Sequence, residues 1–193
     1  MQLKKYVVSL LAVALSTAAF ALPAPADEDQ TAEFMQQYTA QMEDLNKAFE
    51  QTLLPPLKRM LPVIKEIQAN GGENVTEKQE QDIANYADQM DDALDKIVNP
   101  LIAELNDDEC NQIMKEQVVA MLQMQFMQKQ ITASDYEQAV NQVEQQTFTK
   151  QDYSDYLKSS AMGMALGHFI QANLLTEEEQ VLINYLFQAE PEQ

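Results

Sequence analysis

The chain has 193 residues, of which 31 are acidic and 12 basic, and its formal net charge at pH 7 is −19. This balance excludes a nucleic-acid-binding protein, because neutralising phosphates requires clustered lysine and arginine side chains. The single cysteine excludes an intramolecular disulfide scaffold, and a hydrophobic content of 46% is enough for one folded core.

The first 21 residues have the pattern of a secretory signal peptide. Lys4 and Lys5 precede an apolar stretch, Tyr6–Phe20, that is short for a membrane span. The small residues of Ala19-Phe20-Ala21 predict cleavage after Ala21, and Ala24-Pro25-Ala26 is the alternative site. An uncleaved amphipathic anchor is the other interpretation. Cleavage would leave an acidic chain that is not integral to a membrane, in the periplasm or secreted.

Helical periodicity begins after a stretch, Leu22–Gln30, that we expect to be flexible. The apolar residues that follow recur at spacings of three and four, as on the buried face of a helix: Met35, Tyr38, Met42, Leu45 and Phe49. Pro55-Pro56 should end this helix, because proline donates no backbone hydrogen bond. A second helix is expected over Leu57–Ile67, kinked or restarted at Pro62 and ended by Gly71-Gly72.

The rest of the chain continues the helical pattern, and strand signals are almost absent. We expect five more helices, over Glu77–Val98 with Asn99-Pro100 closing it, Cys110–Lys129, Ala133–Gln146, Lys150–Asn173 and Glu177–Gln188. The sequence therefore predicts an all-α fold, a single-domain bundle of about six or seven helices over residues 31–188 with a tail at 189–193. The strongly apolar segments Val118–Met127 and Ala161–Ile170 are expected to be the most buried.

Four threonines mark helix starts. Each is followed three residues later by Gln, Asp or Glu, the pattern of a capping box, in which the two side chains bond each other's backbone N–H groups. The four are Thr76, Thr132, Thr149 and Thr176. We expect each of them to be the N-cap of the helix that follows it.

Two of these segments resemble a family signature. Leu175-Thr176-Glu177-Glu178-Glu179-Gln180, and more loosely Val75-Thr76-Glu77-Lys78-Gln79, look like the Leu-Thr-x-x-Gln motifs of the small helical periplasmic stress chaperones. The first has one residue too many between Thr and Gln. The resemblance implies an exported, all-helical protein with Met-rich helices and a chaperone-like role. That family presents a basic cradle, whereas this chain is strongly acidic.

Methionine and the single histidine suggest a metal site. Met164 and His168 are four residues apart, so they share one face of a helix, and Met121 and Met124 could supply further thioethers from another helix. Thioether and imidazole ligands suit Cu(I). The alternative is ordinary packing, with His168 hydrogen-bonded inside the core. No other cofactor is expected.

Asp88, Asp91, Asp92 and Asp95 form an acidic stripe on the helix predicted to start at Glu77. With that helix ending near Val98, most of the stripe would lie in its last two turns, where the helix dipole disfavours negative charge. A stripe that costs stability could be retained to dock a basic protein or a divalent cation. The other interpretation is a solvated surface.

Cys110 has no partner in the chain, so it is either a buried thiol or the site of a disulfide-linked dimer. No arrangement of residues typical of catalysis is recognisable, and we expect no enzyme activity and no catalytic residues. The sequence therefore favours a non-catalytic periplasmic or secreted binding protein. It would be a chaperone-like helper, or an inhibitor or immunity factor, for a basic protein partner. A Met/His copper-binding protein is the alternative.

Overall fold

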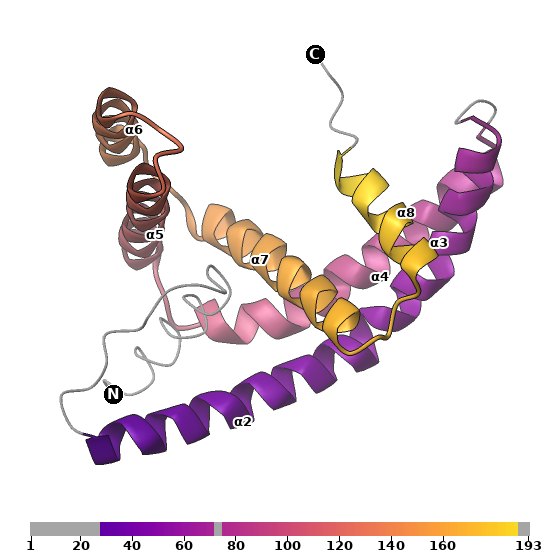
Figure 1. The fold of residues 1–193 in the computed structure, drawn as a ribbon, viewed down its shortest axis with the longest axis horizontal. Coiled ribbons are helices and arrows are strands. Elements are labelled where there is room, and N and C mark those ends of the chain that lie inside the picture. The colour runs from indigo at the N-terminus through magenta and orange to yellow at the C-terminus, as the bar shows by residue number, and fades with distance from the viewer. Residues whose placement is uncertain (1–27, 72–74, 189–193) are drawn as a thin grey trace. The chain divides into compact units, whose positions relative to one another are not determined.

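The structure is a computed structural model that describes residues 28–71 and 75–188. This part of the chain is built from helices, with no strand, so the predicted all-α fold is confirmed (Figure 1). Its seven helices are α2 (Glu28–Thr52), α3 (Leu54–Ala69), α4 (Glu77–Ile102), α5 (Asp107–Met127), α6 (Ala133–Gln145), α7 (Lys150–Gln171) and α8 (Glu177–Gln188). The expected signal peptide, Met1–Ala21, lies outside the described residues.

The chain divides into two compact units. The described part of the first unit is Val98–Ser160, and the second unit combines the described parts of Ala21–Ile97 and Ala161–Gln193. Helices α4 and α7 contribute residues to both units.

The helix starts follow the capping prediction. In all four expected boxes the threonine hydroxyl accepts a hydrogen bond from the backbone N–H three residues on, at 3.2 Å for Thr76, Thr132, Thr149 and Thr176. The side chain of that third residue accepts from the threonine N–H in return. A fifth box, Asn106 with Glu109, starts α5 three residues before the predicted start at Cys110. Its Asn-x-x-Glu spacing was readable in the sequence.

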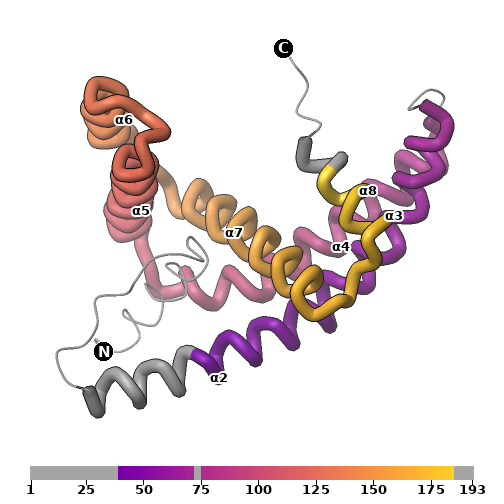
Figure 2. The backbone as a smooth tube through the Cα atoms, viewed as in Figure 1, coloured from indigo at the N-terminus to yellow at the C-terminus, as the bar shows by residue number. Residues whose placement is uncertain are grey.

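In the second unit, α2 and α3 meet at a break centred on Leu53. Pro55 and Pro56 have no N–H to donate to the carbonyls one turn back, so α2 ends at Thr52, as predicted. Figure 2 shows the change in chain direction at this point. Phe49 and Leu53 are fully buried there. They belong to a core that α3, α4, α7 and α8 continue with Leu61, Leu94, Phe169 and Ile183, among others.

In the first unit, α5 and α6 form an antiparallel hairpin (Figure 1). Polar contacts hold the start of α5 to the segment before α7. Asn111 Oδ1 accepts from the N–H of Phe148 at 2.9 Å, and Asp107 Oδ1 accepts from the N–H of Lys150 at 2.9 Å. The Lys150 ammonium donates to the Leu105 carbonyl at 2.8 Å, just beyond the end of α4. These bonds close the unit around Cys110 and Tyr153, both fully buried.

The prediction that Val118–Met127 is among the most buried segments is wrong. All ten of its residues are half-buried or exposed, and Met127 is 64% exposed. In Ala161–Ile170 only Ala161, Ala165 and Phe169 are buried, which is one helix face. Apolar composition shows which residues could be buried, but burial depends on which elements pack against them.

The predicted end of the third helix is also wrong, because α4 continues through Asn99-Pro100 to Ile102. Inside a helix, proline lacks the N–H for one backbone hydrogen bond, and its ring crowds the carbonyl four residues before it. At this position the helix is already close to its end, and the buried side chains of Val98 and Ile102 lie on either side of it. The burial of these two apolar side chains favours continuing the helix past the proline.

Two ion pairs join α3 to α8 within the second unit. Lys58 contacts Glu179 at 2.6 Å, and Lys65 contacts Glu178 at 2.6 Å. The pairs differ in exposure, because the Glu179 side chain is 21% exposed and that of Glu178 is 65% exposed. Burial alone would raise the pKa of Glu179, but the Lys58 ammonium and the Thr176 donors outweigh it and hold that pKa below its ordinary value.

We expect Glu179→Gln to lower the free energy of unfolding by about 1 kcal/mol at pH 7, because it removes the shielded ion pair. Glutamine still serves in the capping box with Thr176. The control, Glu178→Gln, should cost less than about 0.5 kcal/mol, since its pair is exposed.

Because the native pKa of Glu179 is lowered, the contribution of Glu179 to stability is present above about pH 4.3 and is lost as the pH falls through the native pKa. Urea denaturation of both variants at pH 7 and at about pH 3 measures this; equal losses at pH 7 would contradict it.

Candidate functional site

The acidic stripe lies on the outer face of α4, in the second unit. Thr76 caps the helix, and Met90, Ala93 and Leu94 are buried. At about 100° per residue, the four aspartates centre roughly opposite these side chains. Asp88, Asp91 and Asp92 are exposed and Asp95 is half-buried. The structure therefore presents three carboxylates on one helix face.

The rotation of α4 is fixed from α3 by the only arginine in the sequence. The Arg59 guanidinium lies 5.4 Å from the centre of the Tyr86 ring, a cation–π contact. It also donates to Gln89 Oε1 at 2.8 Å. Tyr86 is half-buried on the side of α4 that carries the buried residues, and Gln89 is exposed at the edge of that side, so both contacts lie away from the centre of the acidic stripe.

The electrostatics of the stripe differ from the expectation based on the helix dipole. Since α4 runs to Ile102, Asp91 and Asp92 lie well inside the helix, and the dipole acts mainly within the terminal turn. Like charges three or four residues apart on a helix, such as those of Asp88 and Asp92, repel each other by a few tenths of a kcal/mol per pair. Asp88 and Asp92 form no ion pair with the residues that the structure describes. A cationic group placed over this face would relieve the repulsion.

The expected copper ligands are divided between the two units. Met121 and Met124 belong to the first unit, and Met164 and His168 belong to the second. His168 Nε2 lies 2.7 Å from Glu50 Oε1, so the histidine is hydrogen-bonded, as the packing interpretation expects. A carboxylate partner of this kind also orients metal-binding histidines, so the contact favours neither interpretation. Over residues 28–71 and 75–188, no cluster of three His, Cys, Asp or Glu side chains is placed to hold a metal.

Cys110 is fully buried in the first unit, as expected for a thiol that packs as a small hydrophobe. Burial raises the pKa of its thiol, Lys150 opposes this, and Asp107 and Glu109 add to it. The net effect is a raised pKa, which disfavours the reactive thiolate. A disulfide to a second chain would first require the sulfur to become exposed.

The α5–α6 hairpin carries an exposed apolar surface that the sequence pattern did not predict. Met121, Phe126 and Met127 are exposed there, and Phe126 stacks on Tyr136 of α6 with ring centroids 5.4 Å apart. The strongly apolar composition of this segment led to the expectation of burial. The signal that could have identified it is the absence of any charged residue between Glu116 and Lys129.

No family model, curated protein or solved structure matches this chain. The two segments that resemble the stress-chaperone signature form capping boxes, Thr176 with Glu179 and Thr76 with Gln79. In the described part of the chain, no helix is long and apolar enough to span a membrane. Function is therefore inferred from the surfaces themselves.

Proposed function

We propose that this protein is a non-catalytic binding protein that docks a basic protein partner on the acidic face of α4. The observation that carries this function is the exposure of Asp88, Asp91 and Asp92 opposite the buried residues of the same helix. The net charge of −19 adds a long-range field that attracts a cationic partner and speeds its association. The signal-peptide pattern of Met1–Ala21 favours a role in the periplasm or outside the cell.

The arrangement suits a folded partner with a complementary basic surface. The helix holds the backbone positions of these carboxylates three and four residues apart on one face, and the Arg59 contacts lie away from the centre of that face. Fixed charges favour a partner whose lysines and arginines are also fixed, which is the recognition expected of an inhibitor or immunity factor. A chaperone-like helper would instead use the exposed apolar side chains of α5.

Replacing the three exposed carboxylates tests the proposal. We expect Asp88→Asn, Asp91→Asn and Asp92→Asn together to remove capture of the partner from periplasmic extract at low salt. With the captured protein purified, its association rate should fall about tenfold and become less dependent on salt. The free energy of unfolding should change by less than about 0.5 kcal/mol, because the residues are exposed.

The control removes the same amount of charge elsewhere. Glu43→Gln, Glu137→Gln and Glu144→Gln change exposed carboxylates on α2 and α6. This triple variant should retain the partner and most of its salt dependence. If both triple variants weaken binding equally, only the net charge matters and α4 is not the docking face. A wild-type protein that captures no partner at low salt would contradict the proposed function altogether.

A further inference from the structure

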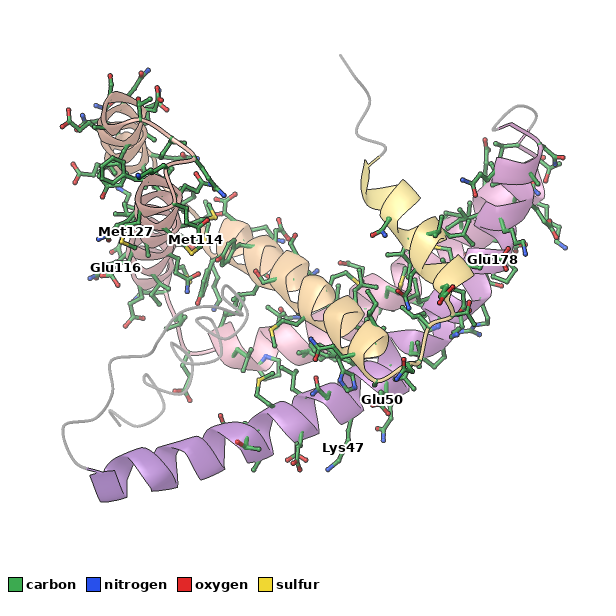
Figure 3. All side chains as sticks on the ribbon, viewed as in Figure 1. Lys47, Glu50, Met114, Glu116, Met127 and Glu178 are labelled. Carbon is green, nitrogen blue, oxygen red and sulfur yellow. The ribbon has the colours of Figure 1, made fainter. Side chains whose placement is uncertain are left out.

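The end of α3 carries the only asparagine in the chain that is followed by glycine, Asn70-Gly71. Asn70 is the C-cap of α3, with φ −91° and ψ 14°, and Gly71 has a left-handed φ of 71°. Both residues are exposed. In Figure 3, α3 continues past the labelled Glu178 of α8 to this end. The pair is therefore open to water where the helix stops.

The backbone nitrogen of Gly71 is the group that can react with the neighbouring side-chain amide. Glycine has no side chain to shield this nitrogen, and a Cβ built on Gly71 would meet no atom of the described structure within 4 Å. The Gly71 N–H donates to the Gln68 carbonyl at 3.0 Å. This single turn bond follows the last residue of α3, and hydrogen bonds at a helix end open at low cost in free energy.

We infer that Asn70 is a site of spontaneous modification, in which the Gly71 nitrogen converts its side-chain amide into a carboxylate. Asn70 rotates away from its helical ψ, which opens the turn bond to Gln68. The Gly71 nitrogen then loses its proton and attacks Cγ of Asn70. A bond forms between this nitrogen and Cγ, the bond from Cγ to Nδ2 breaks, and ammonia leaves with the proton. The product is a cyclic imide.

Water completes the reaction by opening the imide at one of its two carbonyl carbons. Cleavage of the new bond to Cγ gives aspartate and restores the original backbone. Cleavage of the bond between the Gly71 nitrogen and the main-chain carbonyl carbon gives isoaspartate, whose main chain runs through the former side chain. Water is the only co-reactant and ammonia the only product released. Asn99 cannot react in this way, because Pro100 has no N–H.

Either product places a negative charge at the C-terminal end of α3. This helix has no basic residue in its last turn, and the helix dipole disfavours an anion there. Glu66, four residues before Asn70, adds repulsion between like charges. Glu66 Oε2 also accepts from Gln79 Nε2 of α4 at 3.4 Å. We therefore expect the modification to loosen the last turn of α3 and its contact with α4.

Peptide mapping by mass spectrometry, after incubation of the wild-type protein at about 37 °C and about pH 7 to pH 9, measures conversion at every asparagine. Asn70 should react first, and faster at higher pH, because the attacking nitrogen must lose its proton. Its rate should be within about 30-fold of the rate in a free peptide of residues 66–73, since only the turn bond has to open. A slower rate in the folded protein, or an earlier reaction at another asparagine, would overturn the inference.

Two substitutions test the role of Gly71. Gly71→Ala places a methyl group beside the attacking nitrogen and should slow the reaction at least about tenfold. Asn70→Gln should abolish it on the same timescale, because glutamine would have to form a larger ring. Circular dichroism checks that both variants fold. Equal rates in Gly71→Ala and the wild type would show that the Gly71 nitrogen is not the attacking group.

Hydrogen exchange measures the structural consequence. Amides 66–71 should exchange at least about threefold faster in the incubated wild-type protein than in incubated Asn70→Gln. Asn70→Asp carries the new charge without the altered main chain, so it should show a smaller increase. Equal exchange in incubated wild type and incubated Asn70→Gln would overturn the predicted loosening. The inference is independent of the proposed function, because Asn70→Gln should capture a basic partner as the wild type does.

Discussion

Phe49→Ala is expected to lower the free energy of unfolding by about 3–5 kcal/mol. The ring of Phe49 is fully buried near the end of α2, one turn before the fully buried Leu53. Removing it leaves a cavity, because the break at Pro55-Pro56 fixes the chain and limits how far α2 and α3 can close around the space. Domains are typically stable by about 5–15 kcal/mol, so much of the stability would be lost. Thermal and urea denaturation followed by circular dichroism measure the effect, expected to be roughly 10 °C or more in Tm.

The matched control is the same substitution at an exposed phenylalanine. Phe126 is 40% exposed and contacts Tyr136 by stacking. We expect Phe126→Ala to cost about 1 kcal/mol, from the lost stacking and the partial burial. A loss at Phe126 as large as that at Phe49 would mean that the α5–α6 hairpin is packed more tightly than its exposure indicates.

The helix starts that a threonine capping box marks were the most predictable part of this fold. A capping box is local, because the threonine and its partner three residues on satisfy each other without any other element. This explains why the starts at Glu77, Ala133, Lys150 and Glu177 were predicted to the residue. The break before Pro55-Pro56 was predictable for the same reason, since a missing N–H acts on its own chain.

Burial was less predictable, because it depends on packing between elements distant in sequence. The apolar stretch Val118–Met127 could have been a central helix or an uncovered hairpin, and only the structure distinguishes them. The end of α4 depended likewise on the burial of Val98 and Ile102 around Pro100. Sequence spacing placed Asp88, Asp91 and Asp92 on one exposed face correctly. Sequence spacing could not show that the helix dipole has little effect on Asp91 and Asp92, because this depends on where α4 ends.

The copper ligands illustrate the same limit at a site. Spacing places Met164 and His168 on one helix face, but it cannot show what else contacts the imidazole. In the structure the contact is Glu50, from a helix more than a hundred residues away in sequence. No periodicity within α7 signals that carboxylate.

Folding changes the pH at which the hydroxyl of one buried tyrosine in the first unit loses its proton. Tyr153 is fully buried, and its hydroxyl has no hydrogen-bond partner among the described residues. Burial strongly raises the pKa of this hydroxyl, and the neighbouring Cys110 and Tyr156 add to the shift. The folded protein therefore holds the phenolic proton at a pH where the unfolded chain, with a pKa near about 10, releases it. Stability from this group is constant below about pH 10 and is lost as the pH rises further.

Tyr153→Phe is accordingly expected to raise the free energy of unfolding by about 1–3 kcal/mol at pH 7, because it removes a buried hydroxyl that no protein group satisfies. Above about pH 10 the difference in free energy of unfolding between the variant and the wild type should grow by up to about 1.4 kcal/mol per pH unit. The reason is that the variant has no phenolic proton to lose on unfolding. Other titrating groups, including Cys110, are common to both proteins and cancel in the difference. Urea denaturation at pH 7, 10 and 11 measures both effects. A variant less stable than the wild type at pH 7 would show that the Tyr153 hydroxyl is hydrogen-bonded in solution. A stability difference that does not change with pH would show that the Tyr153 hydroxyl titrates normally in the folded protein.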